Sequence, residues 1–281
     1  MSDRYRGDER REPIVNLPGV IVGLILLFAA IHAARVFLLG DEGDAALLRL
    51  FAFTPGQFTF AFDPDRVAGE LTRLAREGLR DRLVVGQYFL GDGFQPWTVL
   101  SYAFLHADWT HLAVNSLWLA AFGAPVATRF GAGRFLALLA VTAVAGAALH
   151  YAVHPVDLTP VIGASAAVSG VMAAAVRFVF RAGAPLGPAL PYPRPPDESV
   201  RLPAFGVVEA LRNRRVIQFS LIWFAVNLVI GLLAVPLGIA ESGIAWEAHA
   251  GGFIAGFFLF PLFDPIRSAP GAPPEDAWRD A

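Results

Sequence analysis

Six long apolar runs divide the chain, and they constrain its fold more than any other feature of the sequence. A helix needs about 20 residues to cross roughly 30 Å of hydrocarbon, and each run is near or above that length. Charged residues make up only 16% of the chain, whereas a soluble domain carries about a quarter. We therefore expect an all-α, polytopic membrane protein built as a six-transmembrane-helix bundle. The predicted helices cover roughly residues 14–39, 104–126, 135–153, 161–181, 216–240 and 244–263.

The distribution of arginine predicts the orientation of this bundle. All 22 basic residues are arginine, and positive charge is enriched in cytoplasmic segments. Arginines gather in the N-terminal tail (1–13) and in a Pro/Arg-rich segment (182–215), whereas the turns at 154–160 and 241–243 contain none. We therefore expect the N-terminal tail, the 182–215 loop and the C-terminal tail (264–281) in the cytoplasm.

The longest segment outside the runs is 41–103, which we expect to form an extracytoplasmic first loop. Within it, 63–83 places leucines at helical spacing, which predicts an amphipathic surface helix. The proline-rich stretch 185–196 predicts an irregular linker. With so little sequence outside the runs, we expect one membrane domain over 14–263.

Composition excludes several kinds of chemistry. The chain has no cysteine, which rules out disulfides, thiolate nucleophiles and cysteine–zinc sites. It also has no lysine, so a lysine base or Schiff base is excluded. The net charge of −2 argues against a nucleic-acid partner.

Polar side chains inside the apolar runs are the candidate functional residues, because ionisable groups at membrane depth are expensive. With the N-terminus inside, the second, fourth and sixth runs all pass from outside to inside, and each has polar groups in its first turns. They are His106, His111 and Asn115 in the second run, Ser165 and Ser169 in the fourth, and His249 in the sixth. Three runs thus place polar groups at a similar depth.

Spacing along these runs predicts close contact between them. His111 and Asn115 are four residues apart, so they share one helix face. Small residues flank the serine and the histidine, and such residues let helix backbones approach closely in lipid. They include Gly163, Gly252 and Gly256. We expect this approach to let Ser165 reach His249.

Plainer interpretations compete with a catalytic one. Small-residue patterns often serve packing alone, and a serine in a membrane helix often bonds to its own backbone, which is the role expected of Ser169. His111 and Asn115 would then form a polar clamp between helices. These alternatives stay open from the residues alone.

The remaining polar residues near the run ends are expected to be interfacial. His150 and His154 lie at the end of the third run, and His32 and Arg35 near the end of the first can snorkel or cap. A metal site is disfavoured, because no histidine pair has an acidic partner at ligand spacing.

Taken in order, three motifs resemble the signatures of the rhomboid intramembrane serine proteases of the bacterial six-helix type. They are "HADWTHLAVN" (106–115), "GAS" (163–165) and "AHAGGFIAG" (248–256), and "PWTVLSYAFLH" (96–106) resembles the entry from the family's long first loop. Each motif alone is weak, but three in order on the appropriate helices are specific.

The resemblance implies a function and a role for each matching residue. Ser165 would be the nucleophile and His249 the general base of a dyad without an acid, with no cofactor and no metal. His111, Asn115 and the backbone N–H of Ser165 would form the oxyanion hole. The expected substrates are single-span membrane proteins cut near the extracytoplasmic face, and the expected location is the bacterial inner membrane.

The sequence departs from the family pattern at four positions. Ala166 follows the serine where glycine is usual, and Ser169 replaces an aromatic residue. Thr98 follows Trp97 where arginine is usual, and Ala127 replaces the acid that pairs with Arg129. These departures put loop stability and gating in doubt more than the chemistry.

Two other functions stay open beside the protease. One is an inactive rhomboid-like binder of membrane clients, and the other is a small transporter or channel. If the chain is a protease, we expect a narrow outlet that favours cleavage after a small residue. The residues expected to line it are Ala164, Ala166, Ala167 and Ala248.

Overall fold

The computed structural model describes residues 17–91, 93–189, 195–233 and 245–266. These residues form helices joined by turns and loops, and no β-strand occurs within the described ranges. The N-terminal tail, most of the C-terminal tail and the expected 241–243 turn lie outside them.

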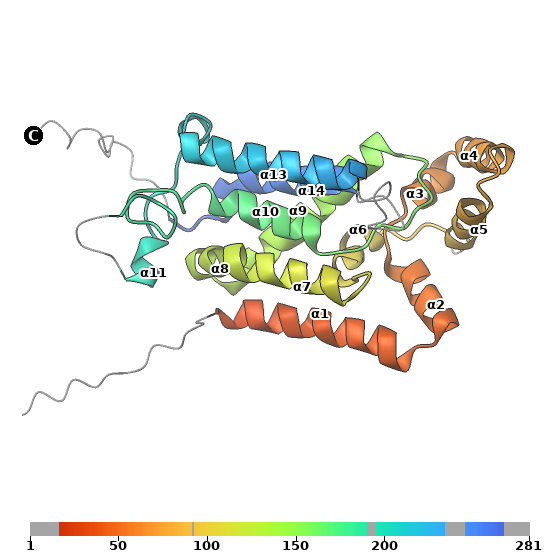
Figure 1. Ribbon diagram of the computed structural model, residues 1–281, viewed down its shortest axis with the longest axis horizontal. Coiled ribbons are helices and arrows are strands. Elements are labelled where there is room, and N and C mark those ends of the chain that lie inside the picture. The colour runs from red at the N-terminus through yellow and green to blue at the C-terminus, as the bar shows by residue number, and fades with distance from the viewer. Residues whose placement is uncertain (1–16, 92, 190–194, 234–244, 267–281) are drawn as a thin grey trace, which may run out of the picture.

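The long helical stretches lie side by side as a bundle, and the shorter helices gather at its ends (Figure 1). The bundle contains α1 (Gly19–Leu38), α7 (Trp109–Trp118), the π-turn η2 (Leu119–Gly123), α8 (Ala124–Phe130), α9 (Ala132–Val153), α10 (Ser165–Ala175), α13 (Arg214–Leu233) and α14 (Trp246–Phe263). The first loop supplies α2 (Asp41–Phe51), α3 (Pro55–Phe62), α4 (Pro64–Arg76), α5 (Arg80–Phe89), α6 (Thr98–Ser101) and η1 (Tyr102–Phe104). Between α10 and α13 lie α11 (Pro196–Ser199) and α12 (Val207–Ala210). We call the end of the bundle near α2 to α6 the site end; α7, α10 and α14 begin there (Figure 1).

By length and composition, three helices in the described ranges could cross a membrane: α1, α9 and α13. The helix α10 is also apolar but has only 11 residues, so it is shorter at both ends than the predicted run 161–181. It cannot begin earlier because Gly163 has a φ of 127°, outside the helical region. The count of six spans stays a prediction.

The helix α10 is enclosed by its neighbours. Every residue from Ala166 to Ala175 is buried, and α9 and α14 are its principal contacts. A helix that meets protein on all sides needs no bulky side chains against lipid, which explains why this stretch is so rich in alanine and glycine.

The single amphipathic helix predicted over 63–83 is instead two helices. The first, α4, ends at Arg76 because Gly78 adopts a left-handed φ of 72°, a conformation that glycine adopts freely. Its amphipathic character is confirmed, since Val67 and Leu74 are buried in a small apolar cluster.

Of the two roles expected of His32 and Arg35, to snorkel or to cap, snorkelling to the membrane surface is wrong. Both side chains are buried. The guanidinium of Arg35 pairs with Asp44 at 2.6 Å and donates to the carbonyl oxygen of His106 at 2.6 Å, while the His32 ring packs edge-on against Trp109. The inward face of α1 offers these residues protein partners, so they fasten α1 to α2 and to the turn before α7.

A second buried ion pair lies at the opposite end of the bundle. Arg129 at the end of α8 contacts Asp264 after α14 at 2.8 Å, and their side chains are 0% and 6% exposed. Arg129 also donates to the carbonyl oxygens of Val200 and Leu202. Asp264 therefore pairs with Arg129 in place of the acid that position 127 lacks.

Candidate active site

Ser165 and His249 meet at the site end of the bundle. The Ser165 hydroxyl oxygen lies 2.6 Å from His249 Nε2, which is hydrogen-bonding distance. Ser165 is the first residue of α10 and His249 lies in the first turn of α14, and both side chains are partly buried. The structure thus brings together the two residues that the motifs single out.

A third residue, Asn227 of α13, was not predicted to belong to the site. Its Oδ1 lies 2.6 Å from His249 Nδ1, and its Nδ2 donates to the Trp223 carbonyl oxygen at 2.8 Å. Because the second bond fixes which end of the amide faces the ring, Oδ1 can only accept, and Nδ1 must carry the proton. His249 Nε2 is then free to accept the proton of Ser165. The available signal was an amide in the middle of the apolar run 216–240, whose other amide, Gln218, lies near the beginning of the run.

The ring of His111 lies beside Ser165 at Gly163. A Cβ atom at Gly163 would lie 2.9 Å from His111 Nε2 and 3.6 Å from Ser165 Oγ, so these two atoms border one small space. The N–H of Ala107 donates to His111 Nδ1, so a neutral ring carries its proton on Nε2 and can donate into that space. His106 lies in the turn before α7, with its ring packed against His111.

Asn115 is buried on α7, and its side-chain NH₂ donates to the carbonyl oxygen of His111. One of its two N–H donors is used within its own helix, so the second is the one available to an oxyanion. The backbone N–H of Ser165 belongs to the first turn of α10, where N–H groups have no partner inside the helix. The His111 ring borders the space beside Ser165 Oγ directly, whereas the other two donors are assigned from their positions on α7 and α10.

Glycines on α14 let it approach α10 closely. A Cβ at Gly252 would overlap the Ala166 carbonyl oxygen, and a Cβ at Gly256 would overlap that of Gly170. The predicted packing role of both glycines fits this contact. Gly163 differs from the expectation, since it precedes the helix and makes room for the His111 ring.

Two departures from the family motif have local explanations. Ala166 is buried, and its methyl faces Gly146 of α9, where a Cβ would lie only 2.6 Å away. That methyl is therefore accommodated in the core. Ser169 donates to the Ser165 carbonyl oxygen at 2.6 Å, which is the backbone-bonding role expected of it.

The four alanines predicted to line one outlet do not line a single opening together. Ala164, Ala166, Ala167 and Ala248 are all buried and pack into the apolar core of the bundle. Ala166 and Ala248 fill interfaces between helices, whereas Ala164 and Ala167 also line the apolar cavity described next.

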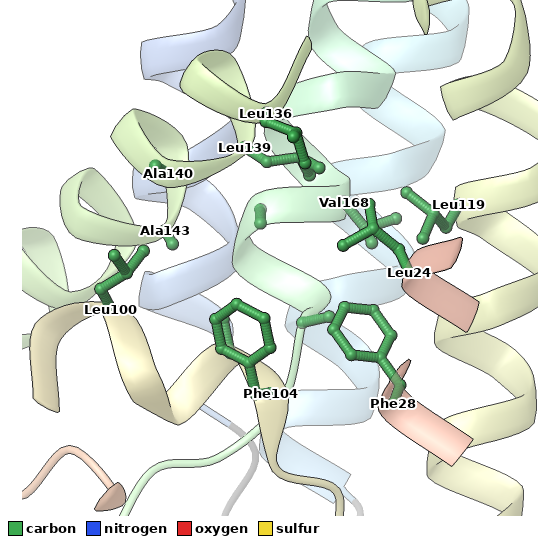
Figure 2. Close-up of a pocket in the computed structure, with 13 residues that line it drawn as sticks. Leu24, Phe28, Leu100, Phe104, Leu119, Leu136, Leu139, Ala140, Ala143 and Val168 are labelled. Carbon is green, nitrogen blue, oxygen red and sulfur yellow. The ribbon is translucent and has the colours of Figure 1, made fainter. Parts of the chain in front are cut away.

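An apolar cavity of about 210 Å³ lies beside α10 (Figure 2). Leu24 and Phe28 of α1, Phe104, and Leu139 of α9 are among its lining residues, with Val168 on the α10 side. Every lining residue is apolar and Ser165 is not one of them. Ala164, which directly precedes Ser165, and Ala167 do line it, so the cavity borders the beginning of α10 beside the serine–histidine site.

A family model described as the rhomboid domain matches residues 93–264, well over half of the chain. The chain belongs to the rhomboid family. A comparison with curated protein sequences gives no match. The rhomboid match begins after α5 and includes α6 to α14, so it contains Ser165, His249, His111, Asn115 and Asn227. The rhomboid domain indicates an intramembrane protease family, and with the apolar helices it indicates an integral membrane protein.

Proposed function

We propose that this rhomboid protein is an active intramembrane serine endopeptidase. The observation that carries the proposal is the hydrogen-bonded series from Ser165 through His249 to Asn227, in which each contact is 2.6 Å. An inactive binder has no need to hold a histidine in the one tautomer that accepts a proton from serine. A transporter has no need of a serine at this place.

The proposed reaction proceeds through two tetrahedral intermediates. His249 Nε2 takes the Ser165 hydroxyl proton as Oγ attacks the scissile carbonyl carbon. The C–N bond then breaks, and the imidazolium returns the proton to the departing amine, which leaves an ester on Ser165. Water attacks that ester while Nε2 accepts its proton, and Oγ leaves with the proton restored.

Three donors stabilise the oxyanion in this mechanism. They are the His111 Nε2–H, the remaining N–H of Asn115 and the backbone N–H of Ser165. One such donor is typically worth about 2.7–4 kcal/mol in the transition state. The positive end of the α10 dipole acts at the same place.

The proposed substrates are single-span membrane proteins. The site lies at the beginning of α7, α10 and α14, so with both tails in the cytoplasm and six spans it faces the extracytoplasmic side. A peptide bond must leave its helix before a serine can reach it, and that unwinding is easiest near a membrane boundary with weak helix formers. We propose cleavage at this boundary.

The decisive experiment is cleavage of a model single-span substrate by the purified protein in detergent. Wild type should cleave it and react with a fluorophosphonate probe, whereas Ser165→Ala and His249→Ala should do neither while keeping a native melting curve. Ser116→Ala on α7 is the matched control, since its side chain has no hydrogen-bond partner within the described part of the chain, and it should cleave normally. Substrate that co-purifies uncut with wild type would indicate the binder, and near-normal cleavage by Ser165→Ala would overturn the assignment.

A further inference from the structure

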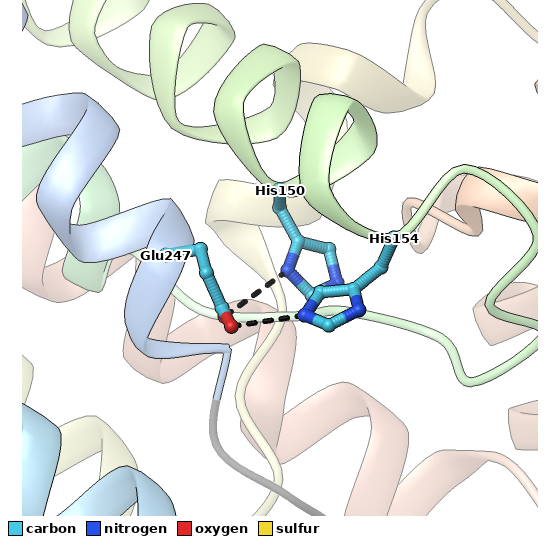
Figure 3. A group of neighbouring side chains, drawn as sticks. All are labelled: His150, His154 and Glu247. Carbon is cyan, nitrogen blue, oxygen red and sulfur yellow. Dashed lines mark hydrogen bonds and ion pairs between the residues drawn. The ribbon is translucent and has the colours of Figure 1, made fainter.

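Three side chains that the proposed chemistry does not use meet at the site end (Figure 3). His150 lies in the last turn of α9, His154 directly follows that helix, and Glu247 lies in the first turn of α14. One ring nitrogen or carboxylate oxygen from each lies within 4.8 Å of the other two. The carboxylate faces both rings from one side (Figure 3).

The distances within this cluster fit ligands that share one metal ion. Glu247 Oε1 lies 2.9 Å from His154 Nε2, and Glu247 Oε2 lies 3.5 Å from His150 Nδ1. Zinc–ligand bonds of about 2.0–2.1 Å at tetrahedral angles place ligand atoms about 3.3 Å apart. The two histidines are four residues apart, so they project from one side of the end of α9.

A simple hydrogen-bonded cluster leaves His150 unexplained. Its side chain is only 5% exposed, and neither ring nitrogen has a hydrogen-bond partner among the residues that the structure describes. A buried polar atom without a partner is costly, and the contact at 3.5 Å to Glu247 is too long to be a good hydrogen bond. A metal ion between Nδ1 and the carboxylate would give Nδ1 a partner.

We propose that His150, His154 and Glu247 bind one divalent transition-metal ion, and that Zn²⁺ fits best. Two imidazoles and a carboxylate suit zinc and its neighbours, whereas Mg²⁺ and Ca²⁺ prefer sites made of oxygen. Three protein ligands leave the fourth position to water. The His154 side chain is 43% exposed, so the ion can enter from the solvent side.

The ion would join the end of α9 to the beginning of α14. Glu247 lies two residues before His249, so the same turn of α14 holds a ligand and the proposed general base. Any effect of the ion on the rate of proteolysis would rest on the proposed function, whereas metal binding and the resulting stabilisation of the fold do not. The ion has no place in the reaction itself, because its ligands do not touch Ser165.

The test uses the full chain without a histidine tag, in the Ser165→Ala background, so that the result does not depend on proteolysis. After treatment with a chelator, the protein is titrated with Zn²⁺ by calorimetry, and bound zinc is counted by mass spectrometry of metals. We expect one ion per chain. The melting temperature should rise by about 5 °C or more at a free Zn²⁺ concentration about 100 times Kd.

Two variants and a control decide the assignment. His154→Ala removes an exposed ligand, and Glu247→Gln keeps the side-chain shape; each should weaken zinc binding about 100-fold and abolish the rise in melting temperature. Asp81→Asn, an exposed acid of α5, should bind like the parent. Absence of zinc binding by the parent, or unchanged stoichiometry and affinity in both ligand variants, would overturn the site whatever the outcome of the protease assay.

Discussion

His249 Nδ1 lies 2.6 Å from Asn227 Oδ1, so the histidine that faces Ser165 is held from behind by a side chain of another helix. The motifs lie on α7, α10 and α14, but this third member comes from α13. The site is therefore a hydrogen-bonded series across three helices, and its geometry depends on how α13 packs against α14.

Asn227→Leu should lower kcat by about 10- to 100-fold with little change in KM. The Nδ1–H bond strengthens as the imidazolium forms, and a hydrogen bond to a charged group is worth about 1.5–3 kcal/mol. Steady-state cleavage of a single-span substrate in detergent gives both constants. Gln218→Ala, an exposed residue on the same helix, is the control and should behave as wild type.

Asn227→Asp distinguishes positioning from simple packing. Aspartate keeps an oxygen at the place of Oδ1, so it should recover much of the rate lost in Asn227→Leu. If both variants lose the same rate and the same melting temperature, Asn227 only supports the contact between α13 and α14.

His111→Ala should lower kcat by about 10²–10³-fold, because it removes the donor that borders Ser165. Labelling of Ser165 by a fluorophosphonate should remain detectable, since the nucleophile and base are intact. Thr110, the neighbour of His111 on α7, is exposed, so Thr110→Ala should change neither kcat nor the labelling of Ser165. Asn115→Ala should lower the rate as well, and if both variants lose stability in proportion to rate, the two residues are a clamp.

Arg129→Met should destabilise the protein by about 3–5 kcal/mol, because it leaves the Asp264 carboxylate buried without its partner. Adding Asp264→Leu should recover much of that loss, since both charges are then gone. Thermal unfolding in detergent measures each step. Arg134→Met, at an exposed position of α9, should have little effect; an equal loss there would contradict a role for the buried pair.

The sequence predicted the parts of this site that depend on helix periodicity. Ser165, His249 and the glycines below His249 lie on regular stripes, and such stripes specify which helix faces meet. How the four alanines divide between cavity and interface was not predictable, because periodicity does not say whether a small residue borders a space or fills an interface.

The residues that escaped prediction are those joined by long-range packing. Asn227 has its histidine partner 22 residues away, and Glu247 lies 93 residues from His154. No spacing rule on one helix links such residues. A metal site therefore looked unfavourable in the sequence, because the acid that meets the two histidines belongs to another helix.

Gly256→Ala should destabilise the protein by about 1–3 kcal/mol and reduce labelling of Ser165. A methyl group there would overlap the Gly170 carbonyl, and backbone atoms cannot turn aside as a flexible side chain would. The helices α10 and α14 must then separate, which lengthens the contact between Ser165 and His249. Gly23→Ala is the matched control, because a Cβ at that position of α1 meets nothing within 4 Å. Alanine is also the better helix former, so this control should be neutral or slightly stabilised. Thermal unfolding and the rate of fluorophosphonate labelling report the two effects separately. A Gly256→Ala protein as stable and as reactive as Gly23→Ala would mean that the close approach of these backbones does not set the geometry of the site.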